Sequence, residues 1–350
     1  MAKRLLFLGS DGISKICLEK LLNSYPAFNY EIITTSSKSP PAKLAQESKL
    51  LCHIESKGQM KDWKLLQPNS PIWSTSYDYI VSASFGYLIP GSLISHCKSS
   101  LNMHPSLLPK YRGSSPIQYA IYNNDEKTGV SIITLHPEKF DKGKILIQKS
   151  LDENINTLTY SKLSTKLAVL GGELLTEVLK DYDNYYTKGL EQIIGNEPLA
   201  YKLNSDFAKL DSQNTDELYR RFRSISGTSL NPYFMLNGET RVNILGMRLV
   251  RNDEDMLLKE KYPNAVPGSL WLLYPGINKQ INKNSFIKSI EKLLYLKTGD
   301  GWIVVDDFIP ATKTHDNKMF GDFVNSYFDL EKYMIKKNMT KMTGEDLKFV

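Results

Sequence analysis

Short apolar runs alternate with amphipathic segments along the first half of the chain, and this alternation restricts the fold more than any other feature. Residues 4–9 form an almost continuous apolar run, typical of a strand that is buried on both faces of a parallel sheet. Residues 12–24 repeat apolar side chains at helical spacing, after Ser10 or Asp11, either of which can cap a helix. Residues 30–35 return as a strand. This order predicts a βαβ unit.

The same alternation continues to about residue 179. We expect helices near 41–51, 90–95, 114–123 and 158–179, and strands at 79–84, 100–104, 130–135 and 145–149. This pattern predicts an α/β fold with a doubly wound, mostly parallel sheet. The glycines of Gly9-Ser10-Asp11-Gly12 lack the spacing of a dinucleotide-binding turn, and no acidic partner follows at the right distance. We interpret them as a tight turn between strand and helix.

The pattern changes after residue 182. Residues 183–205 are polar and tyrosine-rich and contain glycine and proline, which favours a linker. A helix is expected at 216–225, followed by short strands at 233–236, 241–250, 268–274, 292–297 and 301–306. Asn237-Gly238 between apolar runs indicates a hairpin. These features predict an α/β domain at 1–182, a linker at 183–205 and a small OB-like β-barrel domain at 206–350.

Composition excludes several classes of protein. Of the 350 residues, 41% are hydrophobic and 23% are charged, as in an ordinary globular protein, so extensive disorder is not expected. The three cysteines, Cys17, Cys52 and Cys97, lie too far apart for a disulfide framework or a paired zinc motif. No apolar run approaches the roughly 20 residues of a membrane-spanning helix, so we expect no membrane partner. The net charge of +6 permits contact with a polyanion without requiring it.

Three polar residues are expected to meet at one edge of the sheet. Asn102 and His104 lie two apart in the strand at 100–104, so their side chains share a face, and Pro105 ends that strand. Ligands of doubly wound sheets bind beyond the carboxyl ends of the strands. Asp141 follows the next strand, which we expect to end at the same edge.

This set of side chains suits acyl transfer from an activated amide. An asparagine amide and a protonated histidine can donate hydrogen bonds to a developing oxyanion. A carboxylate can raise the pKa of the histidine and take the proton of an attacking amine, directly or through water. Neither a metal nor a covalent nucleophile is required. Singly, each residue has an ordinary interpretation, because a histidine at a strand end often serves a structural role and Asp-x-Gly is a common turn.

Together the residues form part of a longer pattern. It comprises Asn102-x-His104, Ser106-Leu107-Leu108-Pro109, Tyr111-Arg112-Gly113, Pro116-Ile117 and Gly129-Val130. The pattern resembles the folate-dependent formyltransferase family. The resemblance implies 10-formyltetrahydrofolate as the formyl donor, no metal, and a catalytic trio of Asn102, His104 and Asp141. It also implies a folate site formed by Phe85, Gly86, Tyr87 and Leu88 together with Ser106, Leu107, Leu108 and Pro109.

The resemblance extends over nearly the whole chain. Ala200-Tyr201-Lys202-Leu203 and Asp322-Phe323-Val324-Asn325-Ser326 resemble the C-terminal domain of the family branch that formylates methionyl-tRNA. This likeness implies charged initiator methionyl-tRNA as the acceptor. The expected tRNA contacts are Lys38, Lys43, Arg112, Lys283 and Lys288. Residues 259–297 hold seven lysines against two glutamates, which either contact tRNA phosphates or form an ordinary solvated face.

Details of the sequence also bear on location. His104-Pro105 and Pro137-Glu138-Lys139-Phe140-Asp141-x-Gly143 resemble mitochondrial rather than bacterial members of the family. We therefore expect a monomer in the mitochondrial matrix, although no amphipathic, arginine-rich presequence is visible. Bacterial members carry a long basic loop after the second strand, whereas residues 34–43 are short here, with Lys38 and Lys43 as their cations. How the acceptor end is held is therefore open.

Two other functions remain open from the sequence. A formyltransferase that acts on a sugar-nucleotide amine would share the folate site and would also have a second domain. A tRNA-binding protein with a vestigial catalytic half is a hypothesis of a different class. The intact trio argues against it.

Overall fold

The computed structural model describes residues 2–55, 76–193, 195–211, 214–236, 240–267, 270–273 and 293–310. The chain divides into two compact units, Met1–Lys202 and Leu203–Val350, and each is considered by itself. The division falls within the segment 183–205 that separates the two sequence patterns. Within the described ranges, no helix combines the length and the apolar character needed to cross a membrane.

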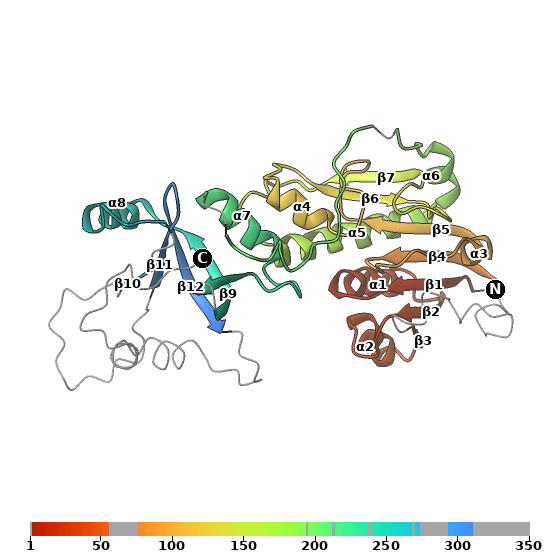
Figure 1. The fold of residues 1–350 in the computed structure, drawn as a ribbon. Helices are drawn as coiled ribbons and strands as arrows, with labels where there is room; N and C mark the ends of the chain where they lie inside the picture. The colour runs from red at the N-terminus through yellow and green to blue at the C-terminus, as the bar shows by residue number, and fades with distance from the viewer. Residues whose placement is uncertain are drawn as a thin grey trace. The chain divides into compact units, whose positions relative to one another are not determined.

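Unit 1 is built on a seven-stranded sheet flanked by helices (Figure 1). Its strands are β1 (Arg4–Gly9), β2 (Asn29–Thr34), β3 (Leu51–Ile54), β4 (Tyr77–Ala83), β5 (Cys97–His104), β6 (Gly129–Ile133) and β7 (Ile145–Ser150). Its helices are α1 (Gly12–Ser24), α2 (Pro40–Glu47), α3 (Gly91–Ser95), α4 (Pro116–Tyr122), α5 (Tyr160–Lys180) and α6 (Tyr182–Lys188). The sequence predicted all of these elements except β3 and α6. The latter lies in the segment that was expected to be an irregular linker.

The order of the strands is β3-β2-β1-β4-β5-β6-β7. The strands from β3 to β5 pair in parallel, which confirms the mostly parallel, doubly wound sheet. However, β6 runs antiparallel to β5, and β7 antiparallel to β6. The expectation that the strand before Asp141 ends at the carboxyl edge is therefore wrong, because β6 ends at Ile133, opposite Asn102 and part-way along β5. The loop after β6 must turn back to bring Asp141 to that edge.

The sheet of unit 1 has a hydrophobic core on each face, and the side chains of β1 alternate between the two cores. Leu5 and Phe7 pack on one face of the sheet with apolar residues of α1 and α5. Leu6 and Leu8 pack on the other face with Leu93 of α3. All four strand side chains are completely buried. Burial on both faces explains why the run at residues 4–9 is continuous rather than alternating.

Unit 2 contains a five-stranded antiparallel sheet in the order β10-β11-β12-β9-β8. Its elements are α7 (Thr215–Ile225), β8 (Tyr233–Leu236), β9 (Thr240–Leu249), α8 (Asn252–Lys261), β10 (Leu270–Leu273), β11 (Leu293–Lys297) and β12 (Trp302–Pro310). The curled sheet is consistent with the expected small barrel-like domain, and the register shifts of β12 against β9 mark a bend. Pairing of β8 with β9 confirms the hairpin, while its turn at Asn237-Gly238 lies outside the described residues. Helix α8 was not predicted.

Substitutions of Gly9 and Gly12 probe how closely the turn between β1 and α1 is packed. The Asp11 side chain caps α1 by accepting a hydrogen bond from the Ser14 amide, and Ser14 Oγ accepts one from the Asp11 amide. A Cβ at Gly9 would lie 2.3 Å from Ser14 Cβ, whereas a Cβ at Gly12 would meet nothing within 4 Å. We expect Gly9→Ala to lower the free energy of unfolding by about 1–3 kcal/mol through overpacking. Gly12→Ala should leave it unchanged or raise it slightly, because alanine favours a helix. Denaturant unfolding measures both values, and equal effects would contradict this packing.

Candidate active site

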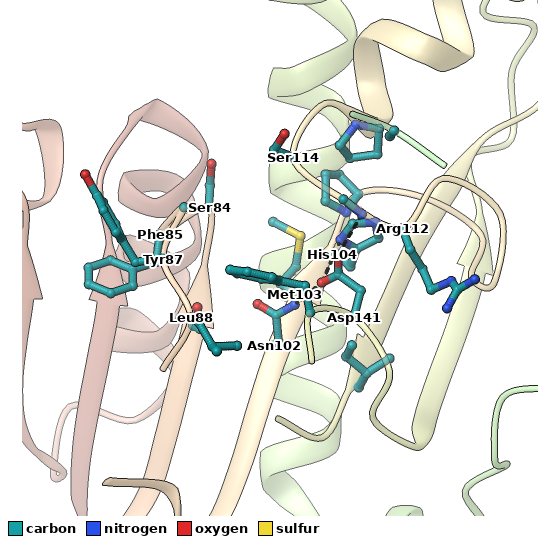
Figure 2. Close-up of a pocket in the computed structure, with 18 of the residues that line it drawn as sticks. Ser84, Phe85, Tyr87, Leu88, Asn102, Met103, His104, Arg112, Ser114 and Asp141 are labelled. Atoms are coloured by element: carbon teal, nitrogen blue, oxygen red, sulfur yellow. Dashed lines mark hydrogen bonds and ion pairs between the residues drawn. The ribbon is translucent and has the colours of Figure 1, made fainter. Parts of the chain in front are cut away.

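A cavity of about 760 Å³ opens beside the carboxyl ends of β4 and β5. Asn102 and His104 of β5 line it, together with Asp141 and residues 85–88. Figure 2 shows Phe85, Tyr87 and Leu88 on one side, His104, Asp141 and Arg112 on the other, and Asn102 between them. In the described part of the chain, no three histidine, cysteine or carboxylate side chains are grouped as metal ligands would be.

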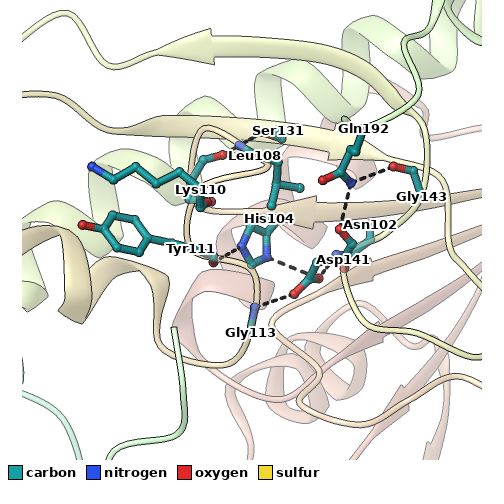
Figure 3. A network of polar contacts seen from close by, with 11 residues as sticks. Asn102, His104, Leu108, Lys110, Tyr111, Gly113, Ser131, Asp141, Gly143 and Gln192 are labelled. Carbon is teal, nitrogen blue, oxygen red and sulfur yellow. Dashed lines mark hydrogen bonds and ion pairs between the residues drawn. The ribbon is translucent and has the colours of Figure 1, made fainter. Parts of the chain in front are cut away.

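The carboxylate of Asp141 is the centre of a polar network (Figure 3). Its Oδ1 lies 3.4 Å from His104 Nδ1 and accepts a hydrogen bond from Asn102 Nδ2, also at 3.4 Å. Its Oδ2 accepts a hydrogen bond of 2.8 Å from the Gly113 amide. The side chains of His104 and Asp141 are only 5% and 9% exposed, so solvent screens their attraction weakly. The structure therefore brings together the three residues singled out in the sequence.

The other side of the His104 ring is bonded to the backbone. Nε2 lies 2.9 Å from the carbonyl oxygen of Tyr111, which can only accept, so Nε2 carries a proton. Burial lowers the pKa of His104, but the charge and hydrogen bond of Asp141, with the Tyr111 carbonyl, outweigh burial and raise that pKa overall. Burial raises the pKa of Asp141, but His104, the Gly113 amide and the charge of Arg112 lower it overall. We therefore expect an imidazolium facing a carboxylate at neutral pH.

Residues 106–109, the second segment of the expected folate site, do not line the cavity. They are bound to β6 and β7 instead. Ser131 Oγ donates to the Ser106 carbonyl at 2.7 Å and accepts from the Leu108 amide at 3.1 Å. Gln148 Nε2 donates to the Leu108 carbonyl at 2.9 Å. These bonds anchor the turn between His104 and Tyr111, and the expected folate contact of residues 106–109 stays a prediction.

Three of the five described non-glycine residues with a positive φ lie at the cavity or contact residues that line it. Ser84, Tyr111 and Asp141 have φ values of 49°, 63° and 53°, in the left-handed region. This conformation costs a non-glycine residue on the order of 1–3 kcal/mol and persists where surrounding contacts impose it. Each of the three presents a group to the site: Ser84 Oγ donates to the Asp11 carboxylate, the Tyr111 carbonyl binds His104, and Asp141 supplies its carboxylate.

Sequence reasoning missed Gln192, which holds the loop that carries Asp141. Its Nε2 donates to the carbonyl oxygens of Asp141 and Gly143, both at 2.8 Å (Figure 3). Gln192 is itself held because Leu190 and Ile145 exchange two backbone hydrogen bonds, of 2.8 and 2.9 Å. It lies 51 residues after Asp141 in a segment without a recognisable motif, so no local signal could have identified it.

The expected tRNA contacts lie in different parts of the molecule. Lys38 and Lys43 are exposed, before and within α2, and neither lines the cavity. Arg112 does line it, and its buried Nε has no hydrogen-bond partner among the described residues. Lys283 and Lys288 lie outside the described residues.

Solved structures define the class of this fold. HypX from Aquifex aeolicus superposes with a TM-score of 0.64 at 13% identity, over 94% of this chain and 49% of HypX. The chain thus spans about half the length of that protein. An N-formyltransferase from Helicobacter canadensis gives a TM-score of 0.53 at 18% identity, over 87% of this chain and 99% of that one. At these identities the likeness concerns the fold alone, which is a Rossmann-like formyltransferase fold.

Sequence comparison then gives the family. Residues 24–179 match the family described as formyl transferase. The methionyl-tRNA formyltransferase of Ehrlichia ruminantium (strain Gardel) is 34% identical over 272 residues, which cover 73% of this chain and 84% of that protein. That of Mycoplasma mycoides is 26% identical over 340 residues, covering 93% and 98%. The chain belongs to the methionyl-tRNA formyltransferase family and is an enzyme that transfers formyl groups.

The ion pair predicts how stability depends on pH. The raised pKa of His104 contributes stability that is complete below 6.5, the ordinary histidine value, and is lost as pH rises through the folded pKa. The lowered pKa of Asp141 contributes stability above 3.8 that is lost as pH falls through its folded pKa. The wild-type protein should therefore have a higher free energy of unfolding than the Asp141→Asn variant, and this difference should be largest between pH 3.8 and 6.5. Urea unfolding from about pH 5 to about pH 9 measures the difference. A difference that does not shrink as pH rises would contradict the pair.

Removing the side-chain hydrogen bonds of Gln192 should impair turnover. Gln192→Leu keeps most of the side-chain volume but releases the loop carrying Asp141. We expect kcat to fall about ten- to a hundredfold, because a shift of about 1 Å in a catalytic group costs on that order. Leu190→Ala is the matched control, since that side chain is 69% exposed and only its backbone is bonded. Steady-state kinetics with thermal unfolding of both variants tests this. An unchanged kcat in a folded Gln192→Leu protein would exclude the positioning role.

Proposed function

We propose that this enzyme transfers the formyl group of 10-formyltetrahydrofolate to the α-amino group of charged initiator methionyl-tRNA. The proposal places it, as a monomer, in the mitochondrial matrix, where it would serve translation initiation. The observation that carries the chemistry is the buried Asp141–His104 pair beside Asn102 in one cavity. The acceptor is supported by relatives named for methionyl-tRNA, which match across both units of the chain.

The three side chains can supply what formyl transfer needs. The amine attacks the formyl carbon, a C–N bond forms, and negative charge grows on the formyl oxygen. The second hydrogen of Asn102 Nδ2 can donate to that oxygen, because this side chain is partly exposed to the cavity. The positive charge of His104 stabilises the same oxygen. Both ring nitrogens are engaged, Nε2 by the Tyr111 carbonyl and Nδ1 by Asp141, so His104 acts on this oxygen through its charge.

The remaining step is proton movement. Asp141 is ionised in the state we expect, so it can accept the proton that the attacking amine loses, directly or through a water molecule. The C–N bond to the folate then breaks as the folate nitrogen takes this proton from the Asp141 carboxyl, directly or through water, and leaves. Tetrahydrofolate and the formylated amine are the products. Asp141 thus accepts and returns one proton, Asn102 and His104 stabilise the developing negative charge, and no covalent intermediate with the enzyme forms.

The donor side of the proposal rests on residues 85–88. The rings of Phe85 and Tyr87 lie edge to face, with centroids 5.9 Å apart, and form an aromatic side of the cavity. Flat heterocycles such as a pterin pack well against such side chains. HypX, which shares the fold, has been solved with tetrahydrofolic acid.

The matrix location rests on the likeness of His104-Pro105 and of residues 137–143 to mitochondrial members of the family. Fluorescence microscopy of the full chain with a C-terminal tag, in cells stained for mitochondria, tests it. A signal confined to the cytosol would overturn the location while leaving the chemistry in place.

A formylation assay separates the acceptors. The wild-type enzyme receives 10-formyltetrahydrofolate with charged initiator methionyl-tRNA, charged elongator methionyl-tRNA, free methionine or a nucleotide-linked amino sugar. We expect the initiator to be formylated fastest. Preference for the amino sugar would overturn the acceptor, and turnover with none of the four would favour a tRNA-binding protein without catalysis.

Asn102→Ala tests the role of the amide in the same assay. We expect kcat to fall by about two orders of magnitude, the usual effect of removing one oxyanion donor. The dissociation constant for folate should stay within about twofold, because the amide acts on charge that develops during the reaction. Calorimetric titration with tetrahydrofolate measures the second quantity. A loss of folate affinity as large as the loss of kcat would assign the amide to binding instead.

A further inference from the structure

Two aromatic rings are exposed on one side of the cavity. The side chains of Phe140 and Tyr201 are 55% and 66% exposed, and both residues line the cavity. Backbone contacts link their segments through the turn at residues 112–113. The Gly113 amide donates to the carboxylate of Asp141, next to Phe140, and the Arg112 carbonyl accepts from the Ala200 amide, next to Tyr201, both at 2.8 Å. The two rings therefore belong to one wall of the cavity.

The same wall carries positive charge that forms no ion pair among the described residues. Four cations, Arg112, Lys139, Lys142 and Lys202, line the cavity. The ion pairs of the described residues include none of these four side chains.

The two carboxylates that line the cavity are already engaged. Asp11 accepts from Ser84 and Ser14, and Asp141 faces His104. A ligand at this wall would therefore meet exposed rings flanked by available cations.

We propose that this surface, the acceptor wall (Phe140, Tyr201, Arg112, Lys139, Lys142 and Lys202), binds the single-stranded 3′ end of the acceptor tRNA. The terminal adenine stacks on the exposed rings, and the cations bind the adjoining phosphates. Aromatic rings interleaved with basic side chains are the chemistry by which proteins bind single-stranded nucleic acid. The inference rests on the proposed function, in which methionyl-tRNA is the acceptor.

The position of the wall suits the nucleoside that carries the amino acid. Phe140 precedes Asp141, whose carboxylate accepts the proton of the attacking amine, and neighbouring Cα atoms lie only about 3.8 Å apart. The methionyl ester on the terminal ribose must reach that carboxylate, so its base has to lie close by. Phe85, Tyr87 and Leu88 lie on the opposite side of the cavity, which leaves them for the folate (Figure 2). The acceptor wall can thus bind the acceptor end of the tRNA without a long basic loop at residues 34–43.

A pair of small substrates tests the stacking. One is a methionylated CCA trinucleotide, and the other lacks only the terminal base. The wild-type enzyme should favour the first in kcat/KM by about five- to a hundredfold, the range expected for one stacked base. Tyr201→Leu and Phe140→Leu should lose most of this preference, Tyr201→Phe should keep it, and KM for the folate should change less than about twofold.

The cations are tested with full-length methionyl-tRNA. Lys142→Gln and Lys202→Gln should each raise KM for tRNA and flatten its dependence on salt. Lys162→Gln is the matched control, because Lys162 is exposed on α5, forms none of the described ion pairs and does not line the cavity. Equal salt dependence in all three variants would overturn the role of the cations.

The outcomes separate this inference from the proposed function. If the folded leucine variants keep the wild-type preference for the base, the stacking is overturned. If they lose activity equally on both trinucleotides, the rings contact the methionyl group and the adenine site is overturned as well. If the wild type formylates no methionylated RNA, including full-length tRNA, the proposed function itself fails, and the inference fails with it.

Discussion

The buried carboxylate of Asp141 is the group on which the rest of the site depends. An isolated carboxylate at this depth would be neutral, because burial disfavours its charged form. Here the charge and hydrogen bond of His104, the Gly113 amide and the charge of Arg112 outweigh burial and lower its pKa, and the Asn102 amide also donates to it. Removing one partner of a buried ion pair typically costs about 3–5 kcal/mol, since the other charge is left uncompensated. The chain therefore has to deliver several distant segments to one place.

The segment that leaves unit 1 does much of this work. Gln192 bonds the backbone on both sides of Lys142 and so holds the loop that carries Asp141. Further on, the Pro198 carbonyl accepts from the Tyr111 amide, and Ala200 exchanges hydrogen bonds with the turn at residues 112–115. Tyr111 supplies the carbonyl that holds His104, and Gly113 in the turn supplies the amide that holds Asp141. A stretch that looked like a linker in the sequence is thus a structural part of the active site.

Local patterns made some features predictable and left others hidden. The run of β1 is continuously apolar, which predicted a strand buried on both faces. Asn102 and His104 lie two residues apart in a strand, which predicted that their side chains share a face. Strand β3 is four residues long and only partly buried, and α8 buries just Glu254 and Leu258, so neither has a strong periodic signal. Glu254 is held there by Arg248, six residues before it, and by a long-range hydrogen bond from Tyr295. The bonds that hold residues 106–109 could not be predicted, because Ser131 and Gln148 lie on other strands.

The charge state of His104 is the most direct measure of the central claim. Side-chain ¹⁵N NMR of the labelled protein reports the protonation of both ring nitrogens, and a His104→Gln variant assigns the signal among the five histidines. The account predicts protons on both Nδ1 and Nε2 at neutral pH, so that the ring loses a proton only above pH 6.5. In the Asp141→Asn variant the pKa of His104 should be lower than in the wild type. A neutral ring at pH 7, or a titration that Asp141→Asn leaves unchanged, would contradict it.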